Sequence, residues 1–329
     1  MILLIGPGAV GTILAAHLMK AQREAVTLFV REKYLAAMQA APELRMDYVN
    51  GRAPLIAPKP QFGTKLDLSG VDYLFICVKF PDLDALLEQL PPVPESCTLV
   101  STLNGVNALR RIRERLPHSR VVPLTVMYNG QLLAPLHARI TTRAQVLISA
   151  GDARLLSAFA GSGMQVQRSS GEAAVWGKLL INLANAICAI THTTFRDLLS
   201  QPDLRAIYVA VLDEAVALIE SAGIPYQLPM PLPYRSYRLL LLHGGPLPWW
   251  VAKIKNGLQD GAYPSMVADI EQGRLTEVDQ LNGEILRLAQ ARNTAAPVNS
   301  GITKLIHGME AQKQPTYLAP AELRGRLGC

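Results

Sequence analysis

The stretch that decides the fold is Gly6-Pro7-Gly8-Ala9-Val10-Gly11, near the start of the chain. It follows the apolar run Ile2-Leu3-Leu4-Ile5, which is typical of a buried parallel strand, and it opens a helical pattern. In this context the spacing G-x-G-x-x-G predicts a dinucleotide-binding turn. Gly6 permits the tight turn, Gly8 lets the backbone approach a pyrophosphate, and Gly11 lets the helix pack closely on the strand.

The amides at the start of the helix, which include those of Ala9 and Val10, are then expected to face the phosphates together with the helix dipole. A plain strand–helix turn is the alternative interpretation of the motif, and the surrounding strand and helix patterns argue against it.

Working outward, strand patterns alternate with helical ones at residues 2–5, 25–30, 71–78 and 98–101. This alternation predicts a parallel sheet with helices on both faces. Short β-like runs follow at 121–127, 138–142 and 145–148, then a helix near 153–160 and a strand near 164–167. After Ser169-Ser170-Gly171 the period is helical, with long apolar-rich stretches at 173–190, 205–222, 276–291 and 298–310. We therefore predict a Rossmann-type doubly wound parallel sheet in residues 1–170 and an all-helical domain in residues 171–329.

The end of the second strand bears on the choice of cofactor. An NAD enzyme places Asp or Glu there to bond the ribose 2′-hydroxyl, whereas this chain has Arg31-Glu32-Lys33. Arg31 can pair with a 2′-phosphate and Lys33 adds positive charge, so NADPH is the predicted cofactor. Glu32 could serve a 2′-hydroxyl if Arg31 points away, and Arg31 could also be an ordinary surface residue.

Two more polar residues follow predicted strands. Lys79 ends the strand at 71–78, and Asn104 follows the strand at 98–101 in Leu103-Asn104-Gly105. Ligands bind at the carboxyl ends of strands in such sheets, so a cation and an amide there suit phosphate, ribose or a carbonyl substrate. An ordinary turn at Asn104-Gly105 explains that pair almost equally well.

A polar stripe on an apolar helix is the most informative feature of the second domain. Between residues 177 and 190 the charged and amide side chains are Lys178, Asn182 and Asn185, spaced i, i+4 and i+7. On a helix they share one face, while the other positions are apolar. A structural polar network is one explanation; a cleft that meets a polar ligand is the one we favour, because burial lowers a lysine pKa and suits it to proton donation.

A second cluster lies in residues 264–279. Ser265 and Asp269 share a helical face, and Gly273 is expected to break that helix. Thr276 with Asp279 could form a capping box for the next helix. Glu277 then falls in a first turn, where interaction with the helix dipole alone explains it.

Composition places the chain among globular proteins. It has 329 residues, half of them hydrophobic and 18% charged, with a net charge of +6. No Lys/Arg run suggests nucleic-acid binding, no signal peptide is recognised, and no uncharged apolar stretch predicts a membrane span. Cys77, Cys97, Cys188 and Cys329 are far apart and lack metal-ligand spacing. This cysteine usage is typical of a reducing compartment, so we expect a cytoplasmic protein.

Together these residues resemble the ketopantoate reductase (2-dehydropantoate 2-reductase) family of pantothenate biosynthesis, over essentially the whole chain. The specific parts of the resemblance are the Lys178 helix and the block at 264–279. It implies that Lys178 is the general acid that protonates the ketone oxygen, and that Glu277 holds the substrate hydroxyl and orients the lysine. It further implies substrate-binding roles for Asn182, Asn185 and Ser265, cofactor contacts for Arg31 and Lys79, and a place for Asn104 between cofactor and substrate.

Two departures bear on the substrate. Family members often carry the second amide eight residues after the lysine, whereas Asn185 is seven after Lys178, and the segment 223–263 is long enough to reshape the pocket. The predicted reaction is NADPH-dependent reduction of 2-dehydropantoate to pantoate. Reduction of another 2-oxo acid or of an opine-type imine is the alternative, and an NADPH-binding sensor is the non-enzymatic one. The expected partners are a small 2-oxo acid and a second copy of the chain.

Overall fold

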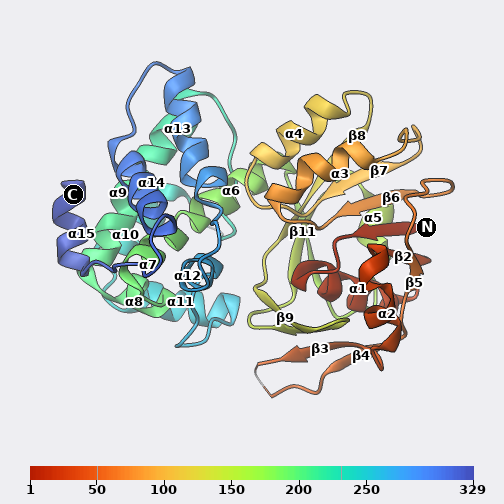
Figure 1. Cartoon of the computed structure of the whole chain (residues 1–329). Helices are drawn as coiled ribbons and strands as arrows, with labels where there is room; N and C mark the ends of the chain where they lie inside the picture. Colours follow the sequence, from red (N-terminus) through yellow and green to blue (C-terminus); the bar gives the residue numbers. More distant parts are fainter. Residues whose placement is uncertain (50, 231) are drawn as a thin grey trace. The chain divides into compact units, whose positions relative to one another are not determined.

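The computed structural model describes residues 1–49, 51–230 and 232–329, which form two compact units (Figure 1). The N-terminal unit comprises Met1–Leu103 and Asn107–Gly171. The helical unit comprises Glu172–Cys329 and also the short segment Asn104–Val106, which its contacts assign to this unit although it follows a strand of the other.

The N-terminal unit is built on an eight-stranded sheet with the order β12-β11-β8-β7-β6-β1-β2-β5. Its strands are β1 (Ile2–Ile5), β2 (Val26–Phe29), β5 (Gln61–Gly63), β6 (Tyr73–Ile76), β7 (Thr98–Ser101), β8 (Arg120–Val126), β11 (Gln145–Ser149) and β12 (Gln165–Ser169). The strands from β5 to β8 are parallel to one another. The predicted doubly wound parallel sheet is therefore confirmed over these six strands.

The other edge of this sheet departs from the wholly parallel arrangement. β11 pairs antiparallel with β8, and β12 runs parallel to β11. The connection from β8 to β11 contains strands rather than a crossover helix, so the chain re-enters the sheet at the end where β8 finished.

Helices cover both faces of the large sheet, as alternation along β1 shows. Ile2 and Leu4 join a core with α1 (Ala9–Ala21) and α5 (Ala153–Ala158), whereas Leu3 and Ile5 join a second core with α3 (Leu83–Gln89) and α4 (Asn107–Arg115). Figure 1 shows α3 and α4 on one side of the strands and α1 on the other. Burial on both faces explains why β1 is apolar at every position.

A second sheet of four strands, with the order β4-β3-β10-β9, was not predicted as a separate layer. Its strands are β3 (Leu44–Tyr48), β4 (Leu55–Ala57), β9 (Gly130–Ala134) and β10 (His137–Ile140). Leu44, Met46, Ala138 and Ile140 turn inward and extend the α1 core. The sheet therefore covers α1 on the side away from the large sheet, and α2 (Glu32–Ala40) follows β2.

The helical unit is built around α9 (Pro202–Ser221), against which several shorter helices pack. They are α6 (Glu172–Asn182), α7 (Ala184–Thr191), α8 (Phe195–Ser200), α10 (Tyr234–His243), α13 (Asn282–Ala291), α14 (Pro297–Glu310) and α15 (Pro320–Leu327). Two more helices lie outside this group: α11 (Leu247–Asn256) packs against α8, and α12 (Ser265–Glu271) packs against α7. Among the described residues of 172–329 no strand is assigned, in agreement with the predicted helical domain. One residue of the long segment 223–263, Pro231, lies outside the description.

The predicted helix at 173–190 is present but divided. α6 ends at Asn182 and α7 begins at Ala184, with Leu183 between them. By length and composition the segment Glu172–Thr191 could cross a membrane, yet 78% of its most apolar window is buried within the fold. Such burial is what a core helix presents.

Candidate active site

The glycine loop between β1 and α1 adopts a geometry that requires its glycines. Gly6 has φ +97°, and a Cβ there would lie 2.7 Å from the carbonyl carbon of Cys77. A Cβ on Gly11 would overlap the carbonyl oxygen of Gly6. A Cβ on Gly8, by contrast, would meet nothing within 4 Å. Gly6 and Gly11 are thus needed by the fold, whereas the space beside Gly8 is open to a ligand.

This loop fits the phosphates of a dinucleotide. The backbone N–H of Thr12 donates to the carbonyl of Gly8 at 2.9 Å, so the amides of Ala9, Val10 and Gly11 come before the first turn is closed. Amides in that position, at the positive end of the helix dipole, bind anions. The open space at Gly8 lets an anion reach them.

Arg31 and Lys79 lie on either side of the glycine loop. The strand order β6-β1-β2 is parallel, so the residues that follow β6 and β2 flank the loop that follows β1. Arg31 caps α2, is exposed, and has a guanidinium nitrogen 3.6 Å from a carboxylate oxygen of Asp82. Lys79 caps the short 3-10 helix Phe80–Asp82. The structure therefore groups three of the sequence motifs at one edge of the sheet.

Asn104 lies on a turn whose shape depends on Gly105. Gly105 has φ +77°, and a Cβ there would overlap the backbone carbonyl oxygen of Gln280. The turn thus rests directly on the backbone that follows Glu277, inside the helical unit. This contact gives Asn104-Gly105 a positional role that an ordinary surface turn lacks.

Lys178, Asn104 and Glu277 form a continuous chain of hydrogen bonds within the helical unit. The ammonium of Lys178 donates to Oδ1 of Asn104 at 2.7 Å, and Nδ2 of Asn104 donates to Oε2 of Glu277 at 2.8 Å. Among the described residues, Asn104 is the one hydrogen-bond partner of that ammonium. Two of its three N–H groups are thus left for a ligand.

The environment of Lys178 favours the transfer of a proton. Burial lowers the pKa of Lys178 from 10.5 to about 8, and the negative charge of Glu277 opposes part of this change by raising it. A lysine with a pKa near 8 is still largely protonated at neutral pH, yet it gives up its proton far more readily than a solvated lysine.

The stripe predicted on this helix is present as a half-buried strip. From Ala173 to Thr191 every residue is buried except Lys178, Ile181, Asn182 and Asn185. Within the described part of the chain no protein group hydrogen-bonds the side chains of Asn182 and Asn185. Two unsatisfied amides beside an ammonium can bind a carboxylate or a hydroxyl. Ile181, which sequence reasoning did not single out, adds an apolar surface to the strip.

Ser265 begins α12, and α12 packs against α7, which carries Asn185. Ser265 is exposed, while Asp269 is buried and accepts hydrogen bonds from Nε and Nη2 of Arg274 at 2.9 and 2.7 Å. The helix ends at Glu271, and Gly273 has φ +62°, as the predicted break requires.

The local structure around Glu277 differs from the prediction. Glu277 precedes the 3-10 helix Val278–Gln280 instead of lying in the first turn of a helix, and α13 starts only at Asn282. The hydroxyl of Thr276 accepts the N–H of Val278 at 3.2 Å, so Thr276 and Asp279 do not form the expected capping box. The hydroxyl of Thr276 can reach the N–H two residues on, as here, or the N–H three residues on, as in a capping box, so the two arrangements compete.

Gly177 is a residue that sequence reasoning missed. A Cβ there would overlap the carbonyl oxygen of Gln227, whose own N–H donates to the carbonyl of Ala173 at 2.7 Å. The connection before α10 therefore packs directly against the helix that carries Lys178. A glycine in the middle of an otherwise apolar helix was the available signal.

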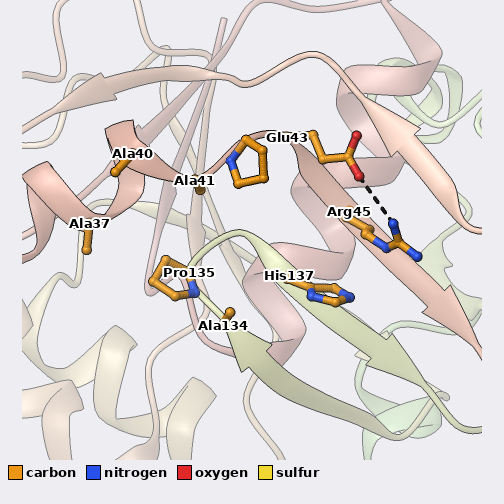
Figure 2. A pocket seen from close by; sticks show the side chains of 9 residues that line it. Ala37, Ala40, Ala41, Glu43, Arg45, Ala134, Pro135 and His137 are labelled. Atoms are coloured by element: carbon orange, nitrogen blue, oxygen red, sulfur yellow. Dashed lines mark hydrogen bonds and ion pairs between the residues drawn. The ribbon is translucent and has the colours of Figure 1, made fainter.

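A separate cavity of about 450 Å³ lies in the N-terminal unit (Figure 2), lined by Ala37, Ala40, Ala41, Pro42, Glu43, Arg45, Ala134, Pro135 and His137. Arg45 is paired with Glu43 at 3.4 Å and with Asp47 at 2.8 Å, and Asp47 also contacts His137. The charged groups thus satisfy one another. The cavity lies at the end of α2 opposite Arg31, and it contains none of the predicted site residues.

Comparisons with known proteins identify the family to which the chain belongs. Residues 2–153 match the family model described as "Ketopantoate reductase PanE/ApbA", and residues 172–310 match "Ketopantoate reductase PanE/ApbA C terminal". The chain is 27% identical to a 2-dehydropantoate 2-reductase of Mycobacterium tuberculosis over 313 residues, which covers 93% of this chain and 96% of the relative.

Solved structures with the same fold include a PanE/ApbA family ketopantoate reductase from Ralstonia eutropha JMP134, with a TM-score of 0.74, 26% identity and coverage of 94% of this chain and 98% of that one. A D-mandelate dehydrogenase with NADH and anilino(oxo)acetate has a TM-score of 0.75 at 19% identity, with coverage of 94% and 98%. Both halves of the chain, with their glycine loop and their lysine helix, thus match one family: the chain belongs to the ketopantoate reductase family and is a nicotinamide-dependent oxidoreductase of the 2-dehydropantoate 2-reductase type.

Proposed function

We propose that the protein reduces 2-dehydropantoate to pantoate with NADPH, and that Lys178 is the general acid. The observation that carries the proposal is the chain from Lys178 through Asn104 to Glu277. An ammonium with a lowered pKa and free N–H groups, held by an amide that a carboxylate orients, suits the protonation of a ketone oxygen.

The residues of the helical unit divide the remaining tasks. Lys178 donates a proton to the ketone oxygen as the carbonyl carbon gains a hydride, so the ketone becomes a secondary alcohol. Asn104 keeps the ammonium in place, and Glu277 accepts a hydrogen bond from a substrate hydroxyl. Asn182 and Asn185, whose amides have no partner among the described residues, bind the carboxylate and hydroxyl together with Ser265.

The N-terminal unit binds the cofactor in this proposal. When bound, NADPH supplies the hydride. The amides of Ala9, Val10 and Gly11 receive the pyrophosphate beside Gly6 and Gly8, as the open space at Gly8 supports. Arg31 contacts the 2′-phosphate and Lys79 adds positive charge on the other side of the loop. The exposed ion pair of Arg31 with Asp82 is weak enough to be exchanged for a phosphate.

The test is steady-state oxidation of NADPH with a panel of substrates: 2-dehydropantoate, unbranched 2-oxo acids, an aryl 2-oxo acid, and oxo acids with added amines. The aryl acid is included because a D-mandelate dehydrogenase shares the fold. We expect kcat/KM to be highest for 2-dehydropantoate and higher with NADPH than with NADH. A higher kcat/KM for another acid or for an imine would identify that compound as the better substrate. If NADPH is oxidised with none of them, the protein binds the cofactor without catalysing this reaction.

We propose further that the protein is cytoplasmic and forms a homodimer. Its four free cysteines fit a reducing compartment. A ketopantoate reductase from Staphylococcus aureus with a similar fold is described as dimeric. Light scattering on the purified chain measures the mass directly, and a monomeric mass at micromolar concentration would contradict the second statement.

A further inference from the structure

The segment that carries Glu277 is attached to α14 at both of its ends. The N–H of Thr276 donates to Oε1 of Glu310 at 2.7 Å, and Nδ2 of Asn282 donates to Oδ1 of Asn299 at 3.0 Å. Glu310 and Asn299 are eleven residues apart on α14, or about 16 Å along the helix axis. The chain from Thr276 to Asn282 therefore runs antiparallel to α14 over most of its length.

The two attachments to α14 differ in how firmly their surroundings hold them. Asn299 is fully buried, and its Nδ2 donates to Oε2 of Glu214 at 2.7 Å; the same carboxylate accepts the N–H groups of Val298 and Asn299. This end is part of the core of the unit. At the other end, Glu310 is the attachment that precedes Glu277, since residues 271–275, which lead into Thr276, are all exposed. After Glu277, Nε2 of His307 on α14 also lies 3.1 Å from Oδ1 of Asp279, a contact between exposed side chains.

Glu310 thus holds the chain at the point where an exposed loop becomes the active-site turn. Within the turn itself, the hydroxyl of Thr276 accepts a hydrogen bond from the N–H of Val278. The carbonyl of Glu277 accepts hydrogen bonds from the N–H groups of Gln280 and Leu281. These local bonds fix the shape of the turn, whereas its position on α14 depends on Glu310 before Glu277 and on the exposed contact of His307 with Asp279 after it. Among the described residues, Glu310 supplies the one side chain that bonds the backbone immediately before Glu277.

We infer that Glu310 is a positioning residue for the reaction: its carboxylate, by bonding the N–H of Thr276, places Glu277 against Asn104 and through it the ammonium of Lys178. The inference rests on the proposed function for its kinetic consequences. It assigns Glu310 no contact with substrate or cofactor. A carboxylate suits this task because a charged acceptor makes a stronger hydrogen bond to a backbone amide than a neutral one.

The experiment compares Glu310→Ala with Glu310→Gln, which keeps an oxygen acceptor of the same length, and with Glu310→Asp, which keeps the charge but shortens the reach. Glu322→Ala is the matched control, because Glu322 is an exposed glutamate on α15. We expect kcat to fall about ten- to hundredfold in Glu310→Ala and Glu310→Asp, as small misplacements of catalytic groups do. Glu310→Gln is expected to stay within about threefold of wild type, and KM for NADPH is expected to be unchanged in all variants.

Two further readouts separate positioning from a general loss of stability. Amide hydrogen exchange of a peptide spanning residues 276–281 should become faster in Glu310→Ala and not in Glu322→Ala. The alkaline limb of the kcat/KM profile should move to lower pH, because a displaced Glu277 no longer raises the pKa of Lys178. Unchanged exchange in Glu310→Ala, or a Gln variant as impaired as the Ala variant, overturns the inference. If the wild type reduces no 2-oxo acid, the proposed function fails, while the exchange comparison still decides the role of Glu310.

Discussion

The ammonium of Lys178 lies 2.7 Å from the amide oxygen of Asn104, although 74 residues separate them in the chain. The amide nitrogen of Asn104 donates in turn to Glu277, which lies 173 residues after Asn104 in the chain. An amide can bridge an ammonium and a carboxylate because it offers an acceptor to the first and a donor to the second. The arrangement keeps the lysine close to a negative charge without a direct ion pair, so the amine keeps N–H groups free for a ligand.

Replacing Lys178 tests the proton donor directly. We expect Lys178→Ala to lower kcat by about 10²–10⁴-fold, the usual contribution of a general acid. Lys178→Arg should lose a similar amount, because a guanidinium keeps the charge and does not release its proton at these pH values. Binding of NADPH, followed by its fluorescence, should be unchanged in both variants. Turnover like that of wild type in Lys178→Arg would show that charge alone suffices.

The pH profile follows from the pKa of Lys178, which burial lowers to about 8. The protonated amine is the active form of a general acid, so kcat/KM should be level below that pH and fall by about tenfold per unit above it. Glu277→Gln removes the charge that raises this pKa, so its limb should lie at lower pH than that of wild type. A limb that moves to higher pH in Glu277→Gln would contradict the assignment.

Gly105→Ala should disturb the position of Asn104. The new Cβ adds left-handed strain at φ +77° and overlaps the carbonyl oxygen of Gln280. Gly273→Ala is the matched control, because its φ is +62° but its Cβ would meet nothing within 4 Å. We expect about 1 kcal/mol of destabilisation in the control and about 2–4 kcal/mol in Gly105→Ala, measured by denaturant unfolding. Equal losses of stability and of kcat in the two variants would mean that the contact with Gln280 is unimportant.

Local sequence patterns predicted the elements whose burial is uniform. The strand Ile2–Ile5, the glycine loop and α1 follow from an apolar run and three glycines, and the structure confirms them. Strand β9 was not predicted, since four of its five residues are exposed and show no alternation. The break at Leu183 was missed because neither glycine nor proline marks it.

In the site, too, sequence patterns predicted the local features and missed the contacts between distant segments. The spacing of Lys178, Asn182 and Asn185 predicted one helical face, and these residues are half-buried, together with Ile181, along the otherwise buried segment 173–191 of α6 and α7. The bonds from Asn104 to Lys178 and Glu277 join distant segments, and no local pattern contains that information. From its spacing alone, Glu277 had an equally good explanation as a helix-terminal charge, and the contact with Asn104 is what distinguishes it.

Arg31 is predicted to set the preference for NADPH. Charge-assisted bonds to a 2′-phosphate are worth enough that Arg31→Ala should raise KM for NADPH by about tenfold or more, with little change for NADH. Asp82→Asn should not weaken NADPH binding, because it releases Arg31 from its exposed ion pair. The control is Arg139→Ala, which removes an exposed arginine from β10. If Arg31→Ala leaves the ratio of the two KM values unchanged, the preference has another origin.

The two glycines Gly8 and Gly11 should separate folding from cofactor binding. Gly8 has φ −76° and open space where a Cβ would stand, so Gly8→Ala should lower the free energy of unfolding by no more than about 1 kcal/mol, the cost of alanine in place of glycine at a helix N-cap. In the proposed mode of binding, the same methyl would occupy the space through which the pyrophosphate reaches the helix amides, so the Kd for NADPH should rise by at least about tenfold.

Gly11→Ala should have the opposite effect. Its Cβ would overlap the carbonyl oxygen of Gly6 and lie 3.0 Å from Cδ2 of Leu4, inside the core between β1 and α1. Overpacking of this kind costs about 1–3 kcal/mol, so thermal unfolding should shift to lower temperature even without cofactor. Calorimetry and NADPH titration of both variants decide the matter. A Gly11→Ala protein as stable as wild type would mean that the fold does not require a glycine at this position. A Gly8→Ala protein that binds NADPH as wild type does would mean that the loop does not hold the pyrophosphate as proposed.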